Sequence, residues 1–255
     1  MHQSMYFMKV SIITAVYNRV HFISNSFNSL YTQTWPSIRH IIIDGESTDG
    51  SLELVNRLIP PQTILISEPD NGLYSALNKG LSFADGDIIG FLHCDDFFAN
   101  EFVIQKIVAL FEETNADCVY GDLQYISRET PHRIVRYWKS GEFSFKKLQR
   151  GWMPPHPTLF VKNEIYQKIG GFNENYRISA DYDFILRLLS TPEIKIAYLP
   201  EVITKMCIGG KSNTFKNIIL KSAEDYIALK HNHVGGMRSL LLKNISKIPQ
   251  FFHRI

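Results

Sequence analysis

One stretch near the middle of the chain limits the folds that are open to it. Residues 88–98 read Ile-Ile-Gly-Phe-Leu-His-Cys-Asp-Asp-Phe-Phe. The almost continuous apolar run at its start is typical of a strand that is buried on both faces of a parallel sheet. Ligands of open α/β sheets bind outside the carboxyl ends of the strands. Asp95 and Asp96 therefore stand where a ligand is expected.

These two neighbouring carboxylates repel each other, and a cation or a proton relieves the repulsion. Hard divalent ions such as Mg²⁺ and Mn²⁺ prefer oxygen ligands and often share their coordination sphere with substrate phosphates. We therefore expect Asp95 and Asp96 to hold a divalent metal. The competing interpretation is that one of them only caps a following helix.

Strand patterns alternate with helical patterns through the first hundred residues. Helices are predicted over 22–30, 52–58 and 73–83, and further strands over 9–16, 38–43 and 63–67. This alternation is typical of βαβ units and a parallel sheet, and right-handed crossovers place the strand ends on one edge. We predict an α/β fold with a mostly parallel central sheet flanked by helices.

The rhythm changes after residue 100. Residues 133–138 alternate with period two, as in an antiparallel ribbon, and residues 151–157 form a loop rich in proline. The other predicted elements are helices near 103–111, 143–150 and 179–189 and strands over 117–126, 156–161 and 195–206.

Composition and cysteine use restrict the class of protein. The 255 residues are 45% hydrophobic and 20% charged, which fits one large α/β domain with an appendage. Three scattered cysteines suit neither a disulfide framework nor a zinc site, so we expect a cytoplasmic protein. Residues 1–9 lack the apolar core of a signal peptide, and no apolar run reaches the roughly 20 residues that span a bilayer.

The carboxyl-terminal part is basic. Residues 211–255 carry eight Lys or Arg against Glu224 and Asp225, and Gly209-Gly210 is the one plausible boundary. We therefore predict a domain over 1–210 and a helical extension over 211–255, with helices near 214–231 and 236–247. A basic tail indicates an anionic surface as partner, and no motif supports nucleic acid.

The second tail helix mixes large apolar and basic side chains. This pattern predicts an interfacial helix at the inner face of the cytoplasmic membrane, where a lipid-linked acceptor would be found. The alternative is that its leucines pack on the main domain while its charges face water. The residues concerned are Arg238, Leu240, Leu241, Leu242, Lys243, Ile245 and Lys247, followed by Pro249, Phe251, Phe252 and Arg254.

Polar side chains gather at the ends of the predicted strands. Thr14, Tyr17 and Asn18 follow the first strand, and Asp44 follows the second. This group suits a nucleotide, because an aromatic ring stacks on a base and a carboxylate accepts its imide N–H. The competing interpretation is that Asp44 only shapes a turn and binds no ligand.

The usual phosphate-binding motifs do not occur. No G-x-G-x-x-G follows the first strand, and the chain has no G-x-x-x-x-G-K-S/T. A metal and isolated cations must then hold any phosphates. Lys79 and Lys211 are the candidates, although Lys79 is equally well explained as a solvated helix residue.

Several motifs in order resemble the family-2 inverting glycosyltransferases of the GT-A fold, in particular bacterial exopolysaccharide and lipopolysaccharide enzymes of the colanic-acid type. The resemblance covers about residues 8–210. Its motifs are Val10-Ser-Ile-Ile-Thr-Ala-Val-Tyr-Asn18, Ile41-Ile-Ile-Asp-Gly-Glu-Ser-Thr-Asp-Gly50, Ser67-Glu-Pro-Asp-Asn-Gly-Leu-Tyr-Ser-Ala-Leu-Asn-Lys-Gly80, Gly86-Asp-Ile-Ile-Gly-Phe-Leu-His-Cys-Asp-Asp96, Gly170-Gly-Phe172 and Ala180-Asp-Tyr-Asp-Phe-Ile-Leu-Arg187.

The resemblance implies a role for each matching residue. Asp95 is the metal-binding member of the family's D-x-D motif and Asp181 the catalytic base, while the nucleotide lies against Thr14, Tyr17, Asn18 and Asp44, with His93 and Cys94 beside it. The sequence departs from the family at His93, where a carboxylate usually contacts the ribose, and at Ala180, where a Glu usually precedes the base. These departures leave a catalytically inactive homologue as an alternative.

Helical spacing separates the two acids near Asp181. Asp181 and Asp183 lie about 200° apart on a helix, so they cannot share one face. Asp183 pairs favourably with Arg187 at i+4, which leaves Asp181 for the site. A helix start with Ser179 as cap and both acids favouring the macrodipole is the simpler alternative.

The expected reaction moves a sugar from a nucleotide-diphosphate sugar, expected to be UDP-linked, to a glycan or lipid-linked acceptor. An acceptor sugar is expected to stack at Trp152 and His156 in the Pro-rich loop, although a structural Trp is the more frequent use. Two rival classes remain, namely a sugar-phosphate nucleotidyltransferase, which normally has a Gly-rich phosphate loop, and a non-catalytic sugar-nucleotide or glycan-binding module.

Overall fold

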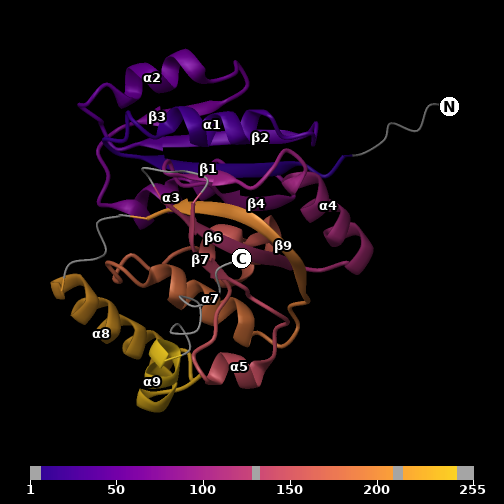
Figure 1. The fold of residues 1–255 in the computed structure, drawn as a ribbon, viewed down its shortest axis with the longest axis vertical. Helices are drawn as coiled ribbons and strands as arrows, with labels where there is room; N and C mark the ends of the chain where they lie inside the picture. The colour runs from indigo at the N-terminus through magenta and orange to yellow at the C-terminus, as the bar shows by residue number, and fades with distance from the viewer. Residues whose placement is uncertain (1–6, 128–132, 209–214, 246–255) are drawn as a thin grey trace.

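The computed structural model describes residues 7–127, 133–208 and 215–245 (Figure 1). Its central feature is one sheet with the strand order β3-β2-β1-β4-β8-β6-β9-β5, in which β7 pairs with β6. The amino-terminal half is parallel, as predicted, with β1 next to both β2 and β4. Its strands are β1 (Val10–Val16), β2 (Ile38–Asp44), β3 (Ile64–Ser67) and β4 (Ile88–Phe91).

The other half of the sheet mixes both directions. β6 runs parallel to β9, whereas β8 is antiparallel to both β4 and β6. The antiparallel ribbon predicted at 133–138 is β7 on β6. The bounds are β5 (Asp96–Phe98), β6 (Cys118–Ile126), β7 (Ile134–Trp138), β8 (Phe160–Lys162) and β9 (Ile196–Cys207).

The prediction that a strand begins at His156 is wrong. Residues His156–Thr158 form a single 3₁₀ turn, and β8 begins only at Phe160. Pro157 lacks a backbone N–H and has a fixed φ, so it suits this turn better than a ladder of hydrogen bonds. The turn points His156 back toward the end of β4, where its ring stacks on Phe91.

Helices cover both faces of the sheet. Ile12 and Ile88 face the side packed by α4, while their neighbours Ile13 and Ile89 belong to the core on the opposite side, with α7. The helices before the Pro-rich loop are α1 (Ile23–Tyr31), α2 (Ser51–Leu58), α3 (Leu73–Ser82), α4 (Val103–Thr114) and α5 (Phe145–Gln149). Those after it are α6 (Asn163–Ile169), α7 (Ala180–Ser190), α8 (Phe215–His231) and α9 (Met237–Ile245).

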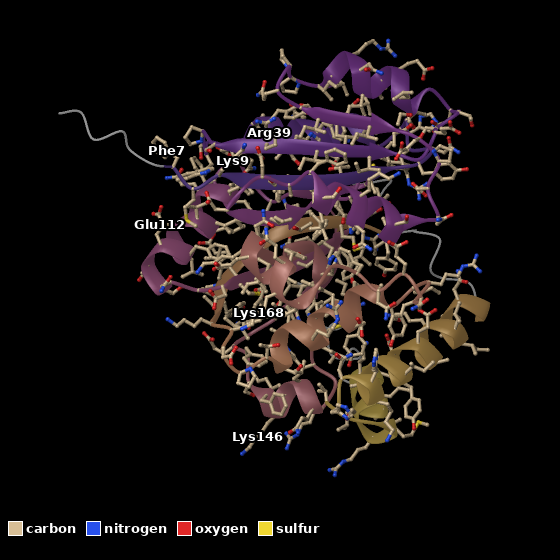
Figure 2. All side chains as sticks on the ribbon, turned by 180° about the vertical axis from the view of Figure 1, so that it is seen from behind. Phe7, Lys9, Arg39, Glu112, Lys146 and Lys168 are labelled. Carbon is tan, nitrogen blue, oxygen red and sulfur yellow. The ribbon has the colours of Figure 1, made fainter. Side chains whose placement is uncertain are left out.

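The two ends of the parallel strands differ in what surrounds them. At the amino ends, Lys9 and Arg39 lie beside Asp85 at the molecular surface (Figure 2). Loops rich in polar side chains follow the carboxyl ends of β1, β2 and β4, as expected for a ligand-binding edge.

The last two helices pack against α7 and each other (Figure 1). Leu229 and Leu240 are buried in the same apolar core as Phe184 and Leu188 of α7. The packing alternative is therefore confirmed for Leu240, while Leu241 and Ile245 remain exposed. None of the helices among the described residues is long and apolar enough to cross a membrane.

The prediction that Lys243 faces an anionic surface is wrong. Its side chain is buried, with Nζ 2.9 Å from Asp225 Oδ2 and 3.0 Å from the ring centroid of Tyr182. A buried ammonium needs such a partner, and Asp225 supplies the opposite charge. Several other residues of the predicted tail or phosphate site lie outside the described residues, namely Gly209, Gly210, Lys211, Lys247, Pro249, Phe251, Phe252 and Arg254.

Candidate active site

Asp44 ends β2 with one carboxyl oxygen available. Its Oδ2 accepts hydrogen bonds from the backbone N–H of Ser47 at 3.1 Å and the hydroxyl of Ser67 at 2.7 Å. Its Oδ1 is buried and accepts no hydrogen bond among the described residues. A buried acceptor without a donor is costly, so Oδ1 fits a ligand that brings an N–H.

Tyr17 and Asn18 follow β1 directly. Asn18 adopts a left-handed backbone conformation (φ 52°), and its Oδ1 accepts from the backbone N–H of Thr48 at 2.9 Å. Asn18 thus joins the loops after β1 and β2. The ring of Tyr17 is 56% exposed and lies over Gly45, where a Cβ would stand 3.3 Å from it. An exposed ring beside Asp44 can stack on a base.

Thr14 does not lie at this edge. Its side chain is buried, with Oγ1 3.0 Å from His40 Nε2, and Tyr31 Oη lies 2.9 Å from His40 Nδ1. Burial lowers the pKa of His40 to about 3, so this ring is neutral at physiological pH. Thr14 therefore takes part in an interior network that joins β1, β2 and α1.

Two further residues predicted to contact the nucleotide, Lys79 and Cys94, interact with other residues of the protein instead. Lys79 Nζ lies 2.6 Å from Glu68 Oε1, where α3 passes the end of β3. Cys94 is buried, and its thiol donates to the carbonyl oxygen of Ala15 at 2.9 Å, while burial raises its pKa. Cys94 thereby joins the turn after β4 to β1.

The carboxylate pair stands on a tight turn between β4 and β5. The backbone N–H of Asp96 donates to the carbonyl oxygen of His93, so Asp95 projects at the tip and is half-buried. Asp96 is fully buried, and its carboxyl group has no side-chain partner among the described residues. Burial, and next the charge of Asp95, raise the pKa of Asp96 well above its ordinary value.

This donor set fits a hard divalent cation. Two adjacent carboxyl groups, one of them buried without a side-chain partner among the described residues, are oxygen ligands of the kind that Mg²⁺ and Mn²⁺ prefer. Within the described ranges, no group of three or more His, Cys, Asp or Glu side chains is placed to hold a metal.

A cavity of about 670 Å³ adjoins this turn. Asp181, His93 and His156 line it together, although they come from α7, the turn after β4 and the Pro-rich loop. The remaining wall is largely apolar and comes from the β6–β7 hairpin, the Pro-rich loop, the end of β9 and the starts of α3 and α8. Lys221, Asp225 and Lys243 of α8 and α9 add charged groups to it. It includes Leu73, Leu123, Tyr125, Val135, Arg136, Trp138, Met153, Pro155, Ile178, Met206, Ile208 and Ile218.

The two histidines form a neutral pair beside Asp181. Their ring centroids are 6.0 Å apart. Burial lowers the pKa of His156 to about 4 and also lowers that of His93, although the charge of Asp181 opposes both shifts. Both rings are therefore uncharged at neutral pH, and they border the cavity without adding positive charge.

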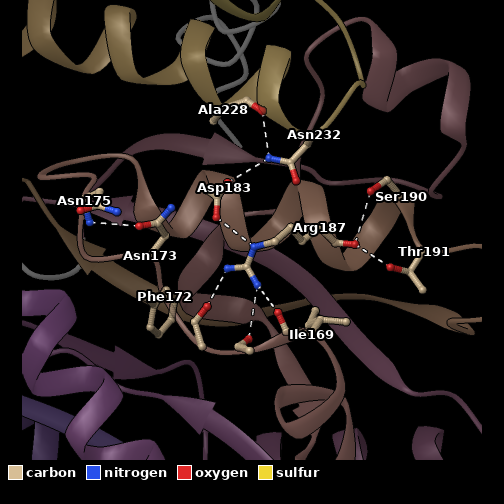
Figure 3. Close-up of polar contacts among 12 residues, drawn as sticks. Ile169, Phe172, Asn173, Asn175, Asp183, Arg187, Ser190, Thr191, Ala228 and Asn232 are labelled. Carbon is tan, nitrogen blue, oxygen red and sulfur yellow. Dashed lines mark hydrogen bonds and ion pairs between the residues drawn. The ribbon is translucent and has the colours of Figure 1, made fainter.

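Helix α7 presents its two acids in opposite directions, as predicted. Asp183 is buried, and its Oδ2 accepts from Arg187 Nε at 2.9 Å while its Oδ1 accepts from Asn232 Nδ2 at 2.9 Å (Figure 3). The guanidinium of Arg187 also donates to the carbonyl oxygens of Ile169 and Gly171. The predicted pairing of Asp183 with Arg187 is confirmed, and Asp181 is left facing the cavity.

Sequence reasoning missed the partner of Asp181. Tyr74 Oη on α3 lies 3.1 Å from Asp181 Oδ1 and 2.6 Å from the carbonyl oxygen of Ile178. Burial, and next the charge of Asp181, raise the pKa of Tyr74 well above its ordinary value, so the hydroxyl keeps its proton to donate. Tyr74 lies within a recognised motif, but spacing alone says nothing of a residue more than one hundred positions away.

The two predicted acceptor residues separate in the structure. His156 lines the cavity, whereas Trp152 is not among the residues of its wall. The indole N–H of Trp152 donates to the carbonyl oxygen of Ser140 at 2.9 Å, and its ring packs against Tyr120 and Phe143. Trp152 has the surroundings of a structural tryptophan.

Known structures with the same architecture identify the class. The fold matches that of Staphylococcus aureus TarS 1-349 in complex with UDP-GlcNAc, with a TM-score of 0.71 and 18% identity over 89% of this chain and 66% of that one. It also matches the mannosyltransferase PcManGT from Pyrobaculum calidifontis in complex with GDP-Man and Mn²⁺ (TM-score 0.64, 18% identity, 97% of this chain and 74% of that one). The fold is therefore the GT-A fold of glycosyltransferases.

Sequence comparisons give the family. The profile described as "Glycosyl transferase family 2" matches residues 11–172, and this chain belongs to that family. A PGL/p-HBAD biosynthesis glycosyltransferase of Mycobacterium tuberculosis (strain ATCC 25177 / H37Ra) is 31% identical over 209 residues, 80% of this chain and 79% of that protein. The chondroitin synthase of Pasteurella multocida (strain Pm70) is 26% identical over 225 residues, 88% of this chain but 23% of that protein.

These comparisons confirm the predicted family, fold and enzyme class. The chain is a glycosyltransferase, and the sugar-phosphate nucleotidyltransferase interpretation falls away. They do not distinguish the colanic-acid type among the members of the family.

The opposite surroundings of the two acids on α7 give a stability prediction. Asp183→Asn removes the charge that compensates Arg187 and is expected to lower the free energy of unfolding by about 3 kcal/mol. Asp181→Asn keeps an oxygen that accepts from Tyr74 and is expected to change it by less than about 0.5 kcal/mol. Urea unfolding measures both, and equal stabilities of the two variants would contradict the assignment.

Proposed function

We propose that this enzyme transfers a sugar from a UDP-linked donor to a lipid-linked or glycan acceptor, with inversion at the anomeric carbon. The observation that carries the proposal is the placement of Asp181. The ion pair of Asp183 with Arg187 leaves Asp181 in the wall of a cavity that adjoins the strand-end carboxylates. A base on one side and a diphosphate site on the other are what a single displacement requires.

The edge formed by β1 and β2 supports a nucleotide. The unused Oδ1 of Asp44 fits the imide N–H of uracil, and the exposed ring of Tyr17 can stack on the base. Guanine also offers an N–H, and TarS and PcManGT bind UDP-GlcNAc and GDP-Man respectively. The loops and strands behind this edge are held together by hydrogen bonds of Asn18, Thr14 and Cys94.

The diphosphate of the donor belongs at the turn between β4 and β5. Asp95 and Asp96 are the residues that would hold Mn²⁺ or Mg²⁺, and a metal bound there supplies positive charge beside the departing nucleotide. The fold neighbour PcManGT binds Mn²⁺ together with GDP-Man. Lys79 can reach the phosphates only by leaving Glu68, and neutral His93 occupies the position expected near the ribose.

The chemical step belongs to Asp181. Its carboxylate takes the proton of an acceptor hydroxyl while that oxygen bonds to the anomeric carbon, and the bond from this carbon to the diphosphate oxygen breaks. The electron pair of the broken bond leaves with the nucleoside diphosphate. Tyr74 shares its one hydroxyl proton between the carbonyl oxygen of Ile178 and Oδ1 of Asp181, which orients the carboxylate toward the cavity. His156 borders the place of the attacking sugar.

The apolar cavity supports an acceptor with an apolar part. Arg136 lies over the ring of Tyr125 at 4.8 Å and that of Trp138 at 5.5 Å, on the face of the β6–β7 hairpin that lines the cavity. A guanidinium among apolar and aromatic side chains suits an anionic group next to a lipid chain. A lipid-linked intermediate of surface polysaccharide synthesis has this chemistry.

The exposed apolar residues of α9 support the proposal that the reaction takes place at a membrane surface. Met237, Leu241 and Ile245 recur at i, i+4 and i+8 and are 66%, 60% and 49% exposed. Arg238 lies on the same exposed side. A stripe of this kind suits an interfacial helix at the inner face of the cytoplasmic membrane.

The first test concerns the base. Asp181→Asn is expected to lower kcat by two to four orders of magnitude, the usual scale of general-base catalysis, because the amide cannot take up the proton. Donor KM is expected to stay within about threefold. A panel of UDP- and GDP-sugars with Mn²⁺ supplies the assay through release of the nucleotide. A variant that keeps the full rate would refute Asp181 as the base.

The second test concerns the metal. Asp95→Ala is expected to abolish metal-dependent turnover, since it removes a proposed ligand at the half-buried tip of the turn, while thermal unfolding stays cooperative. EDTA is expected to have the same effect on the wild type, and added Mn²⁺ to restore it. Full turnover in EDTA, or in Asp95→Ala, rules the metal role out.

The third test concerns the membrane. The full chain is expected to sediment with anionic phosphatidylglycerol vesicles, less at high salt, and hardly with phosphatidylcholine vesicles. A Met237→Ser, Leu241→Ser variant is expected to lose this binding, whereas Phe83→Ser, which alters an apolar residue of similar exposure at the end of α3, is expected to keep it. Equal binding by both variants would exclude the α9 stripe.

A further inference from the structure

The carboxylate of Glu224 accepts hydrogen bonds from three backbone N–H groups near the site. On α8, its Oε1 accepts from the backbone N–H of Arg177 at 2.9 Å, and its Oε2 accepts from those of Ile178 and Ser179 at 2.8 and 2.9 Å. The side chain is buried. Three consecutive backbone donors thus point at one carboxylate.

The segment that Glu224 grips leads directly into α7. Ser179 precedes the first residue of that helix, Ala180, and Asp181 follows. The side chain of Ser179 makes no cap hydrogen bond to the first turn. Instead, a charged acceptor from another helix fixes the backbone from which Asp181 projects, and hydrogen bonds to a charged group are about twice as strong as neutral ones.

The same segment is held from the opposite side. Tyr74 Oη lies 2.6 Å from the carbonyl oxygen of Ile178 and 3.1 Å from Asp181 Oδ1, while Glu224 accepts the N–H of Ile178. Both polar groups of residue 178 are therefore bound, one by α8 and one by α3. The charge of Glu224 contributes to raising the pKa of Tyr74, after burial and the charge of Asp181, which agrees with their closeness.

We propose that Glu224 is a positioning residue for Asp181, so that the active site is complete only with helix α8. The inference rests on the proposed role of Asp181 as base. Glu224 lies outside residues 11–172, which carry the family match. The carboxyl-terminal helices therefore supply part of the catalytic geometry, in addition to any contact with a membrane.

A positioning role and a purely structural role predict different kinetics. A base displaced by about 1 Å can cost roughly a hundredfold in rate, although the protein stays folded. A residue that only stabilises the fold changes the amount of active enzyme and leaves the rate per folded molecule unchanged. The distinction therefore lies in kcat per folded enzyme and in its dependence on Asp181.

The experiment compares Glu224→Gln with Leu229→Ala in the full chain. The first substitution keeps the shape of the side chain but turns an NH₂ group toward backbone donors. Leu229 is a buried α8 residue whose apolar side chain cannot accept a hydrogen bond from those donors. Glu224→Gln is expected to lower kcat at least tenfold with donor KM within about threefold. Leu229→Ala is expected to lower the unfolding midpoint and to keep kcat per folded enzyme.

A double variant shows whether Glu224 acts through Asp181. In the Asp181→Asn background, Glu224→Gln is expected to have little further effect on the residual rate, because residues that act as a unit are non-additive. Tyr74→Phe, which releases both residue 178 and Asp181 Oδ1, is expected to behave likewise. Glu224→Asp, which keeps the charge on a shorter side chain, replaces Glu224→Gln if that variant does not fold.

The outcomes separate the two proposals. An equal loss of kcat from Glu224→Gln in both backgrounds, or a loss that matches Leu229→Ala, overturns the positioning role and leaves the base assignment standing. Full activity of Asp181→Asn overturns the base assignment, and the positioning role falls with it.

Discussion

An ion pair with a buried carboxylate helps to hold helix α7 in its orientation. Arg187 is surrounded by acceptors, namely the carboxylate of Asp183 and the carbonyl oxygens of the turn at 169–171 (Figure 3). Burying a charge is costly unless it is paired and hydrogen-bonded, and this network meets the requirement. It fixes the rotation of α7 about its axis. Because Asp181 lies about 200° from Asp183 on the helix, that rotation directs Asp181 into the cavity.

The carboxyl-terminal helices are also joined to the rest of the protein by charged and polar side chains. Glu224 binds the segment before α7, Asn232 donates to Asp183, and Lys243 is paired with Asp225 beside the ring of Tyr182. Charged side chains that look like a solvated basic tail in the sequence thus act partly as internal connections. They join α8 and α9 to the helix that carries the proposed base, which agrees with the proposed role of Glu224 in the catalytic geometry.

The sequence patterns predicted the features that depend on residues close together in the chain. The apolar run of β4, the strand–helix alternation and the i+4 pairing of Asp183 with Arg187 all follow from periodicity. Contacts between distant segments could not be predicted in this way. Thr14, predicted at the nucleotide-binding edge, is instead bound by His40 in the interior. The partners of the segment before α7, Tyr74 and Glu224, lie far from it in sequence. Only the fold brings such groups together.

The central claim is that Asp181 activates the attacking oxygen for a single displacement. The most direct measurement is proton NMR of the sugar first released when the enzyme hydrolyses its UDP-linked donor, recorded before the anomers equilibrate. With Asp181 as the base and direct attack on the anomeric carbon, the account predicts that the released sugar has the anomeric configuration opposite to that of the donor. Release of the sugar with the donor's own configuration would contradict it.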